Sequence, residues 1–218
     1  MQDAERGDDS RDDERRQMAA TLAFTGVKPG DTVVDMVPGS GYWTRVFSRL
    51  VGASGQVYTV WPKEMLREYG VKGLAGWAEA SVAPHYDNVT DIVQPGGRLA
   101  LPTPADVVFT ALNYHDYHVN EINIDLAAFN KSVFEQLKPG GVYVIVDHAA
   151  EDGSGLDAVN PLHRIDPATV RAEVEAAGFE FDAESEVLRN ADDPRTIKVF
   201  DESIRGHTDQ FIYRFRKP

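Results

Sequence analysis

Histidines and acidic residues concentrate in two short segments of the chain, each directly after an apolar run. Residues 113–118 (Asn-Tyr-His-Asp-Tyr-His) follow DVVFTAL, and Asp147-His148 follows VYVIV. An imidazole titrates near neutral pH, so it can remove a proton from a hydroxyl or a phenol. His115 is therefore the first candidate for a catalytic base, and His148 is the second.

Other polar side chains near these histidines are candidates for the substrate side of a site. They are Tyr114, Asp116 and, from the loop after the second segment, His163. Either Asp116 or Asp147 could orient an imidazole, and the sequence leaves open which pair meets. The alternative for each histidine is a structural one, in which the ring only bonds to the backbone and braces a loop.

The first segment also permits a metal site. His115, Asp116 and His118 form an HDxH arrangement, which His148 could join. Imidazole and carboxylate are ligands that zinc and iron accept. Because this spacing matches no dedicated metal motif, we predict no metal here and keep metal binding as a minor alternative.

A glycine-containing turn lies between an apolar run and a helical stretch in residues 33–50, VVDMVPGSGYWTRVFSRL. The apolar run ends near Asp35, and Gly39 and Gly41 stand in the turn. Glycine permits a positive φ and a close approach of the backbone to a ligand. The turn has neither the GxGxxG pattern of nicotinamide sites nor the GK[ST] of a phosphate loop. It predicts either another kind of small-ligand site or a plain tight turn.

Alternating strands and helices must position these segments. We expect strands at residues 32–37, 56–61, 88–93, 106–112, 142–147, 179–188 and 210–216. We expect helices from residue 12 or 13 to 24 and at residues 42–51, 62–69, 74–82, 124–137 and 166–177.

This alternation implies βαβ units and a parallel sheet, and unbroken apolar runs fit a sheet covered on both faces. No helix is predicted between the last two strands, so they pair antiparallel and add a reversed edge strand. The fold class is α/β: a three-layer sandwich with a Rossmann-like, mostly parallel seven-stranded sheet and an antiparallel last strand. Ligands bind beyond the carboxyl ends of the strands in such sheets, where the glycine turn and both polar segments lie.

The composition excludes several classes of protein. With 22 basic and 35 acidic residues, the net charge of −13 argues against nucleic acid as a partner. The absence of cysteine excludes a disulfide framework, a thiolate metal site and a cysteine nucleophile. The expected partner is a small-molecule substrate, and the sequence does not give the oligomeric state.

Residues 1–16 are almost all charged or small and predict a disordered arm, with one folded domain over residues 17–218. The arm lacks the apolar stretch of a signal peptide. No apolar run approaches the roughly 18–20 residues of a membrane span, so no membrane partner is expected. We expect a cytoplasmic protein as the chain stands, or a periplasmic one if a signal peptide has been removed.

The segment VVDMVPGSG resembles motif I of the class I S-adenosylmethionine-dependent methyltransferases. GVKPGDTVVD, GQVYTV, ADVVFTAL and FEQLKPGGVYVIVD follow the same order of elements, so the resemblance covers residues 18–216. A narrower resemblance links the chain to a group of bacterial predicted methyltransferases of undefined substrate. That one rests on NYHDYH (113–118), VDHAAEDGSG (146–155) and LHRID (162–166).

The resemblance implies S-adenosylmethionine as the cofactor. Asp35, Gly39, Ser40 and Gly41 match the loop that wraps its methionine part. Val37 stands where the motif often has its first glycine.

The resemblance also assigns the adenosine and acceptor sides. In the superfamily the second strand ends in an acid that binds the ribose hydroxyls, and this chain has Trp61 there, with Glu64 as the nearest acid. Trp61 either stacks on the adenine or marks a loss of cofactor binding. Asn113 belongs to the cofactor side near the methyl group, and Tyr42 to the substrate side.

The function implied is methyl transfer from S-adenosylmethionine to a small molecule, with oxygen slightly favoured over nitrogen because of the histidines. Such transfer needs the nucleophile, methyl group and sulfur in line, and a base only if the nucleophile starts protonated. The alternative is a methyltransferase-like scaffold that binds a small ligand without transferring a methyl group.

Overall fold

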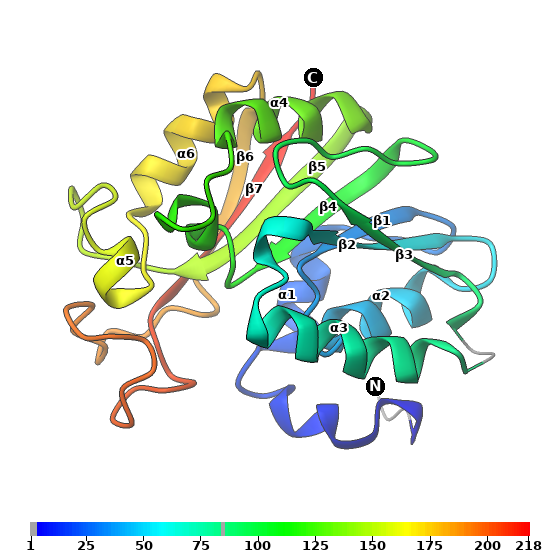
Figure 1. The fold of residues 1–218 in the computed structure, drawn as a ribbon, viewed down its shortest axis with the longest axis horizontal. Helices are drawn as coiled ribbons and strands as arrows, with labels where there is room; N and C mark the ends of the chain where they lie inside the picture. Colours follow the sequence, from blue (N-terminus) through cyan, green and yellow to red (C-terminus); the bar gives the residue numbers. More distant parts are fainter. Residues whose placement is uncertain (1–3, 84–85) are drawn as a thin grey trace.

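The computed structural model describes residues 4–83 and 86–218, which form one sheet between two layers of helices (Figure 1). The strands are β1 (Thr32–Met36), β2 (Gln56–Pro62), β3 (Val89–Gln94), β4 (Ala105–Ala111), β5 (Leu137–His148), β6 (Glu180–Ser185) and β7 (Gln210–Arg216). Their order in the sheet is β3-β2-β1-β4-β5-β7-β6. The predicted three-layer α/β fold class is confirmed.

Two layers of helices cover the sheet. The α-helices are α1 (Met18–Thr25), α2 (Tyr42–Val51), α3 (Glu68–Ser81), α4 (Leu126–Gln136), α5 (Val159–Leu162) and α6 (Pro167–Ala176). Short 3-10 helices are η1 (Ala4–Asp12), η2 (Lys63–Met65) and η4 (His115–His118). In Figure 1, α4 and α6 lie on one side of the sheet and α1, α2 and α3 on the other.

The sheet is parallel except at β7, which pairs antiparallel with both of its neighbours, β5 and β6. The predicted antiparallel last strand is confirmed. The expected position at the edge is wrong, because β7 lies between β5 and β6 and leaves β6 outermost. Burial explains the order: Phe211, Ile212 and Phe215 of β7 are fully covered, whereas residues of β6 alternate between exposed and half-buried.

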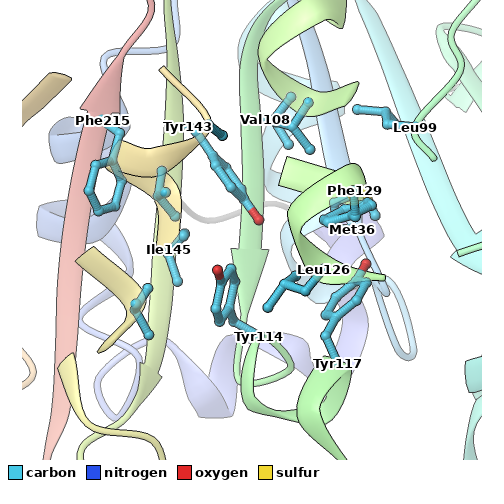
Figure 2. Close-up of a cluster of buried hydrophobic side chains, with 14 of the residues drawn as sticks. Met36, Leu99, Val108, Tyr114, Tyr117, Leu126, Phe129, Tyr143, Ile145 and Phe215 are labelled. Atoms are coloured by element: carbon cyan, nitrogen blue, oxygen red, sulfur yellow. The ribbon is translucent and has the colours of Figure 1, made fainter. Parts of the chain in front are cut away.

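Each face of the sheet has its own core. Val33, Val107 and Val144 face α1 and α2, while Val34, Val108 and Ile145 face α4 and α6. Figure 2 shows part of the core between the sheet and helices α4 and α6, where Tyr143 and Tyr114 lie among aliphatic side chains. Burial of both faces explains why the central strands are apolar without interruption.

Helices α4 and α6 begin at the positions that their capping residues indicate. Asp125 accepts a hydrogen bond from the Ala128 N–H at 3.0 Å, and Asp166 accepts one from Ala168 at 2.9 Å, with Pro167 in the first helical turn. Strand β5 follows α4 directly, so the predicted turn at residues 138–141 is part of the strand.

Helix α3 differs from the two helices predicted at 62–69 and 74–82. The structure has the short η2 and then one continuous helix. Two helices were predicted because glycine disfavours helix interiors, and the region contains Gly70, Gly73 and Gly76. Packing of Gly73 and Trp77 on the glycine turn accounts for the continuous helix.

In the N-terminal segment, the helix begins later than the predicted residue 12 or 13. Residues 4–12 form η1, and α1 begins only at Met18, after Gln17 in the left-handed region (φ 44°). The buried Arg6 guanidinium donates to both carboxylate oxygens of Asp13, at 2.9 and 2.5 Å. This ion pair joins residues 6 and 13, and disorder of the arm stays a prediction. Residues 1–3 lie outside the described residues.

In the part of the chain that the structure describes, no helix combines the length and apolar character needed to cross a bilayer.

Candidate functional site

The glycine turn joins β1 to α2 through three residues with positive φ. Val37 has φ 50°, Gly39 has φ 60°, and Gly41, which caps α2, has φ 85°. The Val37 N–H donates to the Val60 carbonyl at 2.9 Å, which ties the turn to β2. A valine in this region is strained, and such strain concentrates at ligand-binding turns.

Asp35 lies buried at the end of β1. Its carboxylate accepts a hydrogen bond from the Thr44 hydroxyl of α2 at 2.6 Å. Burial raises the pKa of Asp35 to about 7, because desolvation of the charge outweighs the Thr44 hydrogen bond. Thr44 was not predicted; the available signal was a polar residue on the apolar face of a predicted helix.

Helix α3 packs onto the glycine turn. A Cβ on Gly41 would overlap the ring of Trp77, and a Cβ on Gly73 would lie 3.1 Å from the Gly39 carbonyl oxygen. At Gly39 itself a Cβ would meet nothing within 4 Å. Gly41 is thus explained by packing, whereas Gly39 and the exposed Ser40 leave the turn open for a ligand.

Trp61 ends β2 in a small cluster with Trp77 and Tyr86, and only 1% of it is exposed. Its Nε1–H is buried and has no hydrogen-bond partner among the described residues. Stacking of Trp61 on an adenine stays a prediction, since α3 covers the ring in this structure.

The acids nearest to Trp61 are already paired. Glu64 accepts from the Gly96 N–H at 2.7 Å, and Asp91 accepts from the Trp77 indole at 2.6 Å and from the Thr59 hydroxyl. Both acids at this strand end are therefore engaged in hydrogen bonds within the protein.

S-adenosylmethionine fits these residues on two observations. The turn has room at Gly39 where a backbone must approach a ligand, and the unpartnered Trp61 N–H supplies a donor at the position where the superfamily binds ribose. An unpaired buried donor costs about 1–3 kcal/mol, so a ligand acceptor there would stabilise the complex.

Asn113 connects the glycine turn to the polar segment after β4. Its Nδ2 donates to the Met36 carbonyl at 3.3 Å and to the Ala111 carbonyl at 3.0 Å, and its Oδ1 accepts from the Thr110 hydroxyl. Asn113 therefore fixes how the cofactor-side turn and the segment 113–118 lie relative to each other.

His115 and Asp147 form the closest histidine–carboxylate pair among the described residues at this edge. The Asp147 Oδ1 lies 2.8 Å from His115 Nδ1, and the His115 backbone N–H donates to Oδ2 at 2.7 Å. Burial on its own lowers the pKa of His115, but the Asp147 and Asp116 carboxylates outweigh it and raise the pKa to about 9. At neutral pH the His115 ring then holds its proton.

His148 differs from His115 in its environment. Burial lowers its pKa to about 3, so the ring is neutral near pH 7 and is a weaker base than a free imidazole. His148 Nδ1 lies 2.7 Å from the Thr208 hydroxyl, and the ring centroids of His148 and His115 are 6.0 Å apart.

Asp116 and His163 lie on the solvent side of His115. Together with Asp147 and His148, these residues form the histidine group. His115 Nε2 lies 3.3 Å from Asp116 Oδ1, and His163 Nδ1 lies 3.8 Å from the same oxygen. The Asp116 and His163 side chains are 31% and 27% exposed, so this part of the group is open. The structure thus brings together five of the predicted residues: His115, Asp116, Asp147, His148 and His163.

Tyr114 and His118 lie elsewhere. Tyr114 is fully buried (Figure 2), and its hydroxyl donates to Glu173 at 3.0 Å and accepts from Asn130 at 2.8 Å. His118 Nε2 also pairs with Glu173, at 3.1 Å. The place of Tyr114 on the substrate side stays a prediction. The HDxH metal arrangement does not form, because η4 directs the His118 ring toward Glu173.

Tyr42 also lies outside the group. Its hydroxyl donates to Asp13 at 2.6 Å, and the Arg6 and Arg16 guanidinium groups lie 5.1 and 4.3 Å from its ring centroid. Tyr42 anchors the N-terminal segment to α2, and its substrate contact stays a prediction.

A cleft of about 690 Å³ opens between the N-terminal segment and the loop before β7. Its lining includes Arg15, Leu188, Thr208 and Gln210. Thr208 links this cleft to His148. Another cleft, of about 370 Å³, lies beside Lys138 at the end of the sheet where the parallel strands begin, away from the histidines.

Comparison with protein families gives a match over residues 9–83 to the model of protein-L-isoaspartate(D-aspartate) O-methyltransferase. The chain is 26% identical over 200 residues to the ubiquinone/menaquinone biosynthesis C-methyltransferase UbiE of Teredinibacter turnerae, which covers 87% of this chain and 66% of the relative. It is 36% identical over 118 residues to the protein-L-isoaspartate O-methyltransferase of Methanosarcina mazei, which covers 53% of this chain and 40% of the relative. The chain thus spans less than two thirds of the length of these relatives.

Among solved structures, a S-adenosylmethionine-dependent methyltransferase from Aquifex aeolicus superposes with a TM-score of 0.66 at 20% identity. The match covers 95% of this chain and 93% of that one, and it shows the shared fold. Together the comparisons confirm the resemblance to class I methyltransferases. The relatives act on different acceptors, so they leave the acceptor of this chain open.

Proposed function

We propose that this chain, a class I S-adenosylmethionine-dependent methyltransferase, methylates a small molecule and favours an oxygen over a nitrogen acceptor. The observation that carries the proposal is Asn113, which bonds to the glycine turn on one side and begins the histidine-rich segment on the other. Cofactor residues and proton-handling residues thereby share one edge of the sheet.

The cofactor side of the proposal uses residues at the ends of β1, β2 and β4. The cofactor supplies a methyl group already activated on a sulfonium. The residues that would hold it are Asp35, Val37, Gly39, Ser40, Gly41, Trp61 and Asn113. These residues would position the cofactor, since transfer needs the acceptor, methyl group and sulfur in line and water excluded.

The acceptor side of the proposal uses His115 and His148 as catalytic residues, on either side of Asp147. The Asp147 carboxylate bonds to His115 Nδ1 and to the backbone N–H of His148, so one buried group orients both. Asp116 and His163 face solvent beside them and would contact the acceptor. A hydroxyl starts protonated and profits from such neighbours more than a free amine does, which favours oxygen.

The cleft beside Thr208 supports a small acceptor. Its volume lies within the roughly 300–1,000 Å³ of small-molecule sites. The net charge of −13 disfavours a nucleic acid as acceptor.

A specific observation favours the alternative of a ligand-binding scaffold without methyl transfer. Trp61 replaces the ribose-binding acid, and α3 covers both that ring and part of the glycine turn. A chain with this arrangement could retain the fold and bind a different ligand.

The test is formation of S-adenosylhomocysteine from S-adenosylmethionine, with a panel of phenols, alcohols, carboxylates and amines as acceptors. We expect turnover on an oxygen acceptor, with an O-methyl product identified by mass spectrometry. A methylated amine as the preferred product would overturn the oxygen preference. Tight binding of S-adenosylmethionine without turnover on any acceptor class would favour the scaffold alternative.

A further inference from the structure

Three potential metal ligands converge at the open end of the histidine group. They are His115 Nε2, Asp116 Oδ1 and His163 Nδ1, and all three atoms lie within 4.8 Å of one another. The two distances to Asp116 Oδ1 are 3.3 and 3.8 Å. A tetrahedral zinc ion with bonds of about 2.0–2.1 Å separates its ligand atoms by about 3.3–3.4 Å. The spacing therefore admits a first-row transition metal after small movements.

His115 is held in the orientation that a metal ligand requires. Its Nδ1 bonds to the buried Asp147 carboxylate at 2.8 Å, which leaves Nε2 directed at Asp116. A histidine that binds a metal through one nitrogen almost always donates its other N–H to a carboxylate, carbonyl or water, and the partner fixes the tautomer. Asp147 is in turn fixed by the backbone N–H groups of His115 and His148, both at 2.7 Å.

The backbone also brings His163 to this position. His163 follows α5, whose residues pack against η4, and it has φ 55° and ψ 50°. A left-handed conformation is disfavoured at a residue other than glycine, because the Cβ crowds the backbone carbonyl. It directs the imidazole back toward Asp116, and the ring lies 5.5 Å from that of His115 between centroids.

The group is buried on one side and open on the other. His115 and Asp147 have side chains 4% and 0% exposed, whereas Asp116 and His163 are 31% and 27% exposed. Three protein ligands with an open fourth position are typical of catalytic, not structural, zinc sites.

We propose that His115, Asp116 and His163 bind one divalent transition metal ion of the zinc class. This site differs from the HDxH arrangement considered from the sequence: it excludes His118, which pairs with Glu173, and His148, which pairs with Thr208. The binding of the metal does not depend on the proposed methyl transfer. If both hold, His115 acts as a ligand, and the open position would take an acceptor oxygen.

The test is calorimetric titration of the untagged, chelator-treated chain with Zn²⁺ at pH 7.5, in the absence of S-adenosylmethionine. We expect one equivalent to bind, and Co²⁺ to give the visible absorption of a low-coordinate site. Asp116→Asn and His163→Ala should each weaken binding by at least about tenfold. Both residues are partly exposed, so circular dichroism should show folded variants.

His118→Ala is the matched control, because it removes a nearby imidazole that the proposed site does not use. It should bind Zn²⁺ as tightly as the unaltered chain. The proposal is overturned if no Zn²⁺ binds, because the three proposed ligands would then bind protons and no metal ion. It is also overturned if Asp116→Asn and His163→Ala both leave affinity unchanged, or if His118→Ala weakens it as much as they do. None of these outcomes bears on cofactor binding, which the titration does not involve.

Discussion

The ring of Trp77 lies directly against Gly41, so closely that no side chain fits between helix α3 and the glycine turn. Trp77 is fully buried, and its Nε1–H donates to Asp91 at 2.6 Å. The turn that faces the cofactor is thus packed on one side against a helix. Gly41 is therefore needed for packing against α3, whereas Gly39 stays open to a ligand.

Alanine substitutions at Gly41 and Gly39 should therefore have different effects. Both residues have positive φ, which costs alanine about 1 kcal/mol. Gly41→Ala adds an overlap with Trp77 worth a further 1–3 kcal/mol or so, whereas Gly39→Ala adds none. Urea unfolding checks the stabilities, and calorimetry checks whether Gly39→Ala loses affinity for S-adenosylmethionine. Equal destabilisation by the two substitutions would contradict the packing argument.

Phenylalanine substitutions at Trp61 and Trp77 test the unpartnered indole. Trp77→Phe breaks a hydrogen bond to Asp91 and should cost about 1–2 kcal/mol. Trp61→Phe removes an N–H that has no partner among the described residues, so it should cost less. If that N–H serves the cofactor, Trp61→Phe weakens S-adenosylmethionine binding although it costs less stability than Trp77→Phe. Unaltered affinity would remove Trp61 from the cofactor site.

The stability of the chain should depend on pH through Asp35. Burial raises the pKa of Asp35 to about 7, above its unfolded value of 3.8. A raised pKa contributes stability that is full below the unfolded pKa and is lost as the pH rises through the folded one. The free energy of unfolding should therefore fall between about pH 4 and 7, relative to Asp35→Asn, and the difference should then level off.

Urea unfolding at pH 4.5, 6, 7 and 8 measures this difference. The exposed Asp157→Asn serves as the control and should show no such trend relative to the unaltered chain. A difference between the unaltered chain and Asp35→Asn that stays constant from pH 4.5 to 8 would show that Asp35 is not titrating in this range.

His148→Ala should lower turnover without lowering cofactor affinity. Loss of a proton-transfer group typically costs about 10²–10⁴-fold in rate. His148 lies beside the cleft through Thr208 and has no described bond to the glycine turn, so S-adenosylmethionine binding should persist. The control is His118→Ala, whose ring pairs with Glu173. Full turnover by His148→Ala would exclude it as a catalytic residue.

Most of the fold could be predicted because local patterns agree with the sheet. VYVIV and the DPAT start of α6 predict their elements directly, since burial on both faces and an aspartate cap leave clear signals. The place of β7 could not be predicted in the same way. It depends on which strand covers the apolar side chains of β5, a long-range choice that no local pattern records.

The edge of the sheet that holds the candidate site could be predicted, but the direction in which each side chain points could not. Residues after β4 and β5 meet because parallel strands end together, which brings His115 and Asp147 to one edge, but the sequence left open whether Asp116 or Asp147 pairs with an imidazole. The tight turn of η4 sends Tyr114 and His118 into the protein toward Glu173. Glu173 lies 59 residues after Tyr114, and such partners leave no signal in a single sequence.

The central claim is that the edge formed by the glycine turn, Trp61 and Asn113 binds S-adenosylmethionine. Calorimetric titration of the purified chain with S-adenosylmethionine and S-adenosylhomocysteine tests it most directly. The account predicts one equivalent of each, bound with micromolar affinity and weakened by Gly39→Ala. No binding of either compound to a sample that circular dichroism shows to be folded would contradict it.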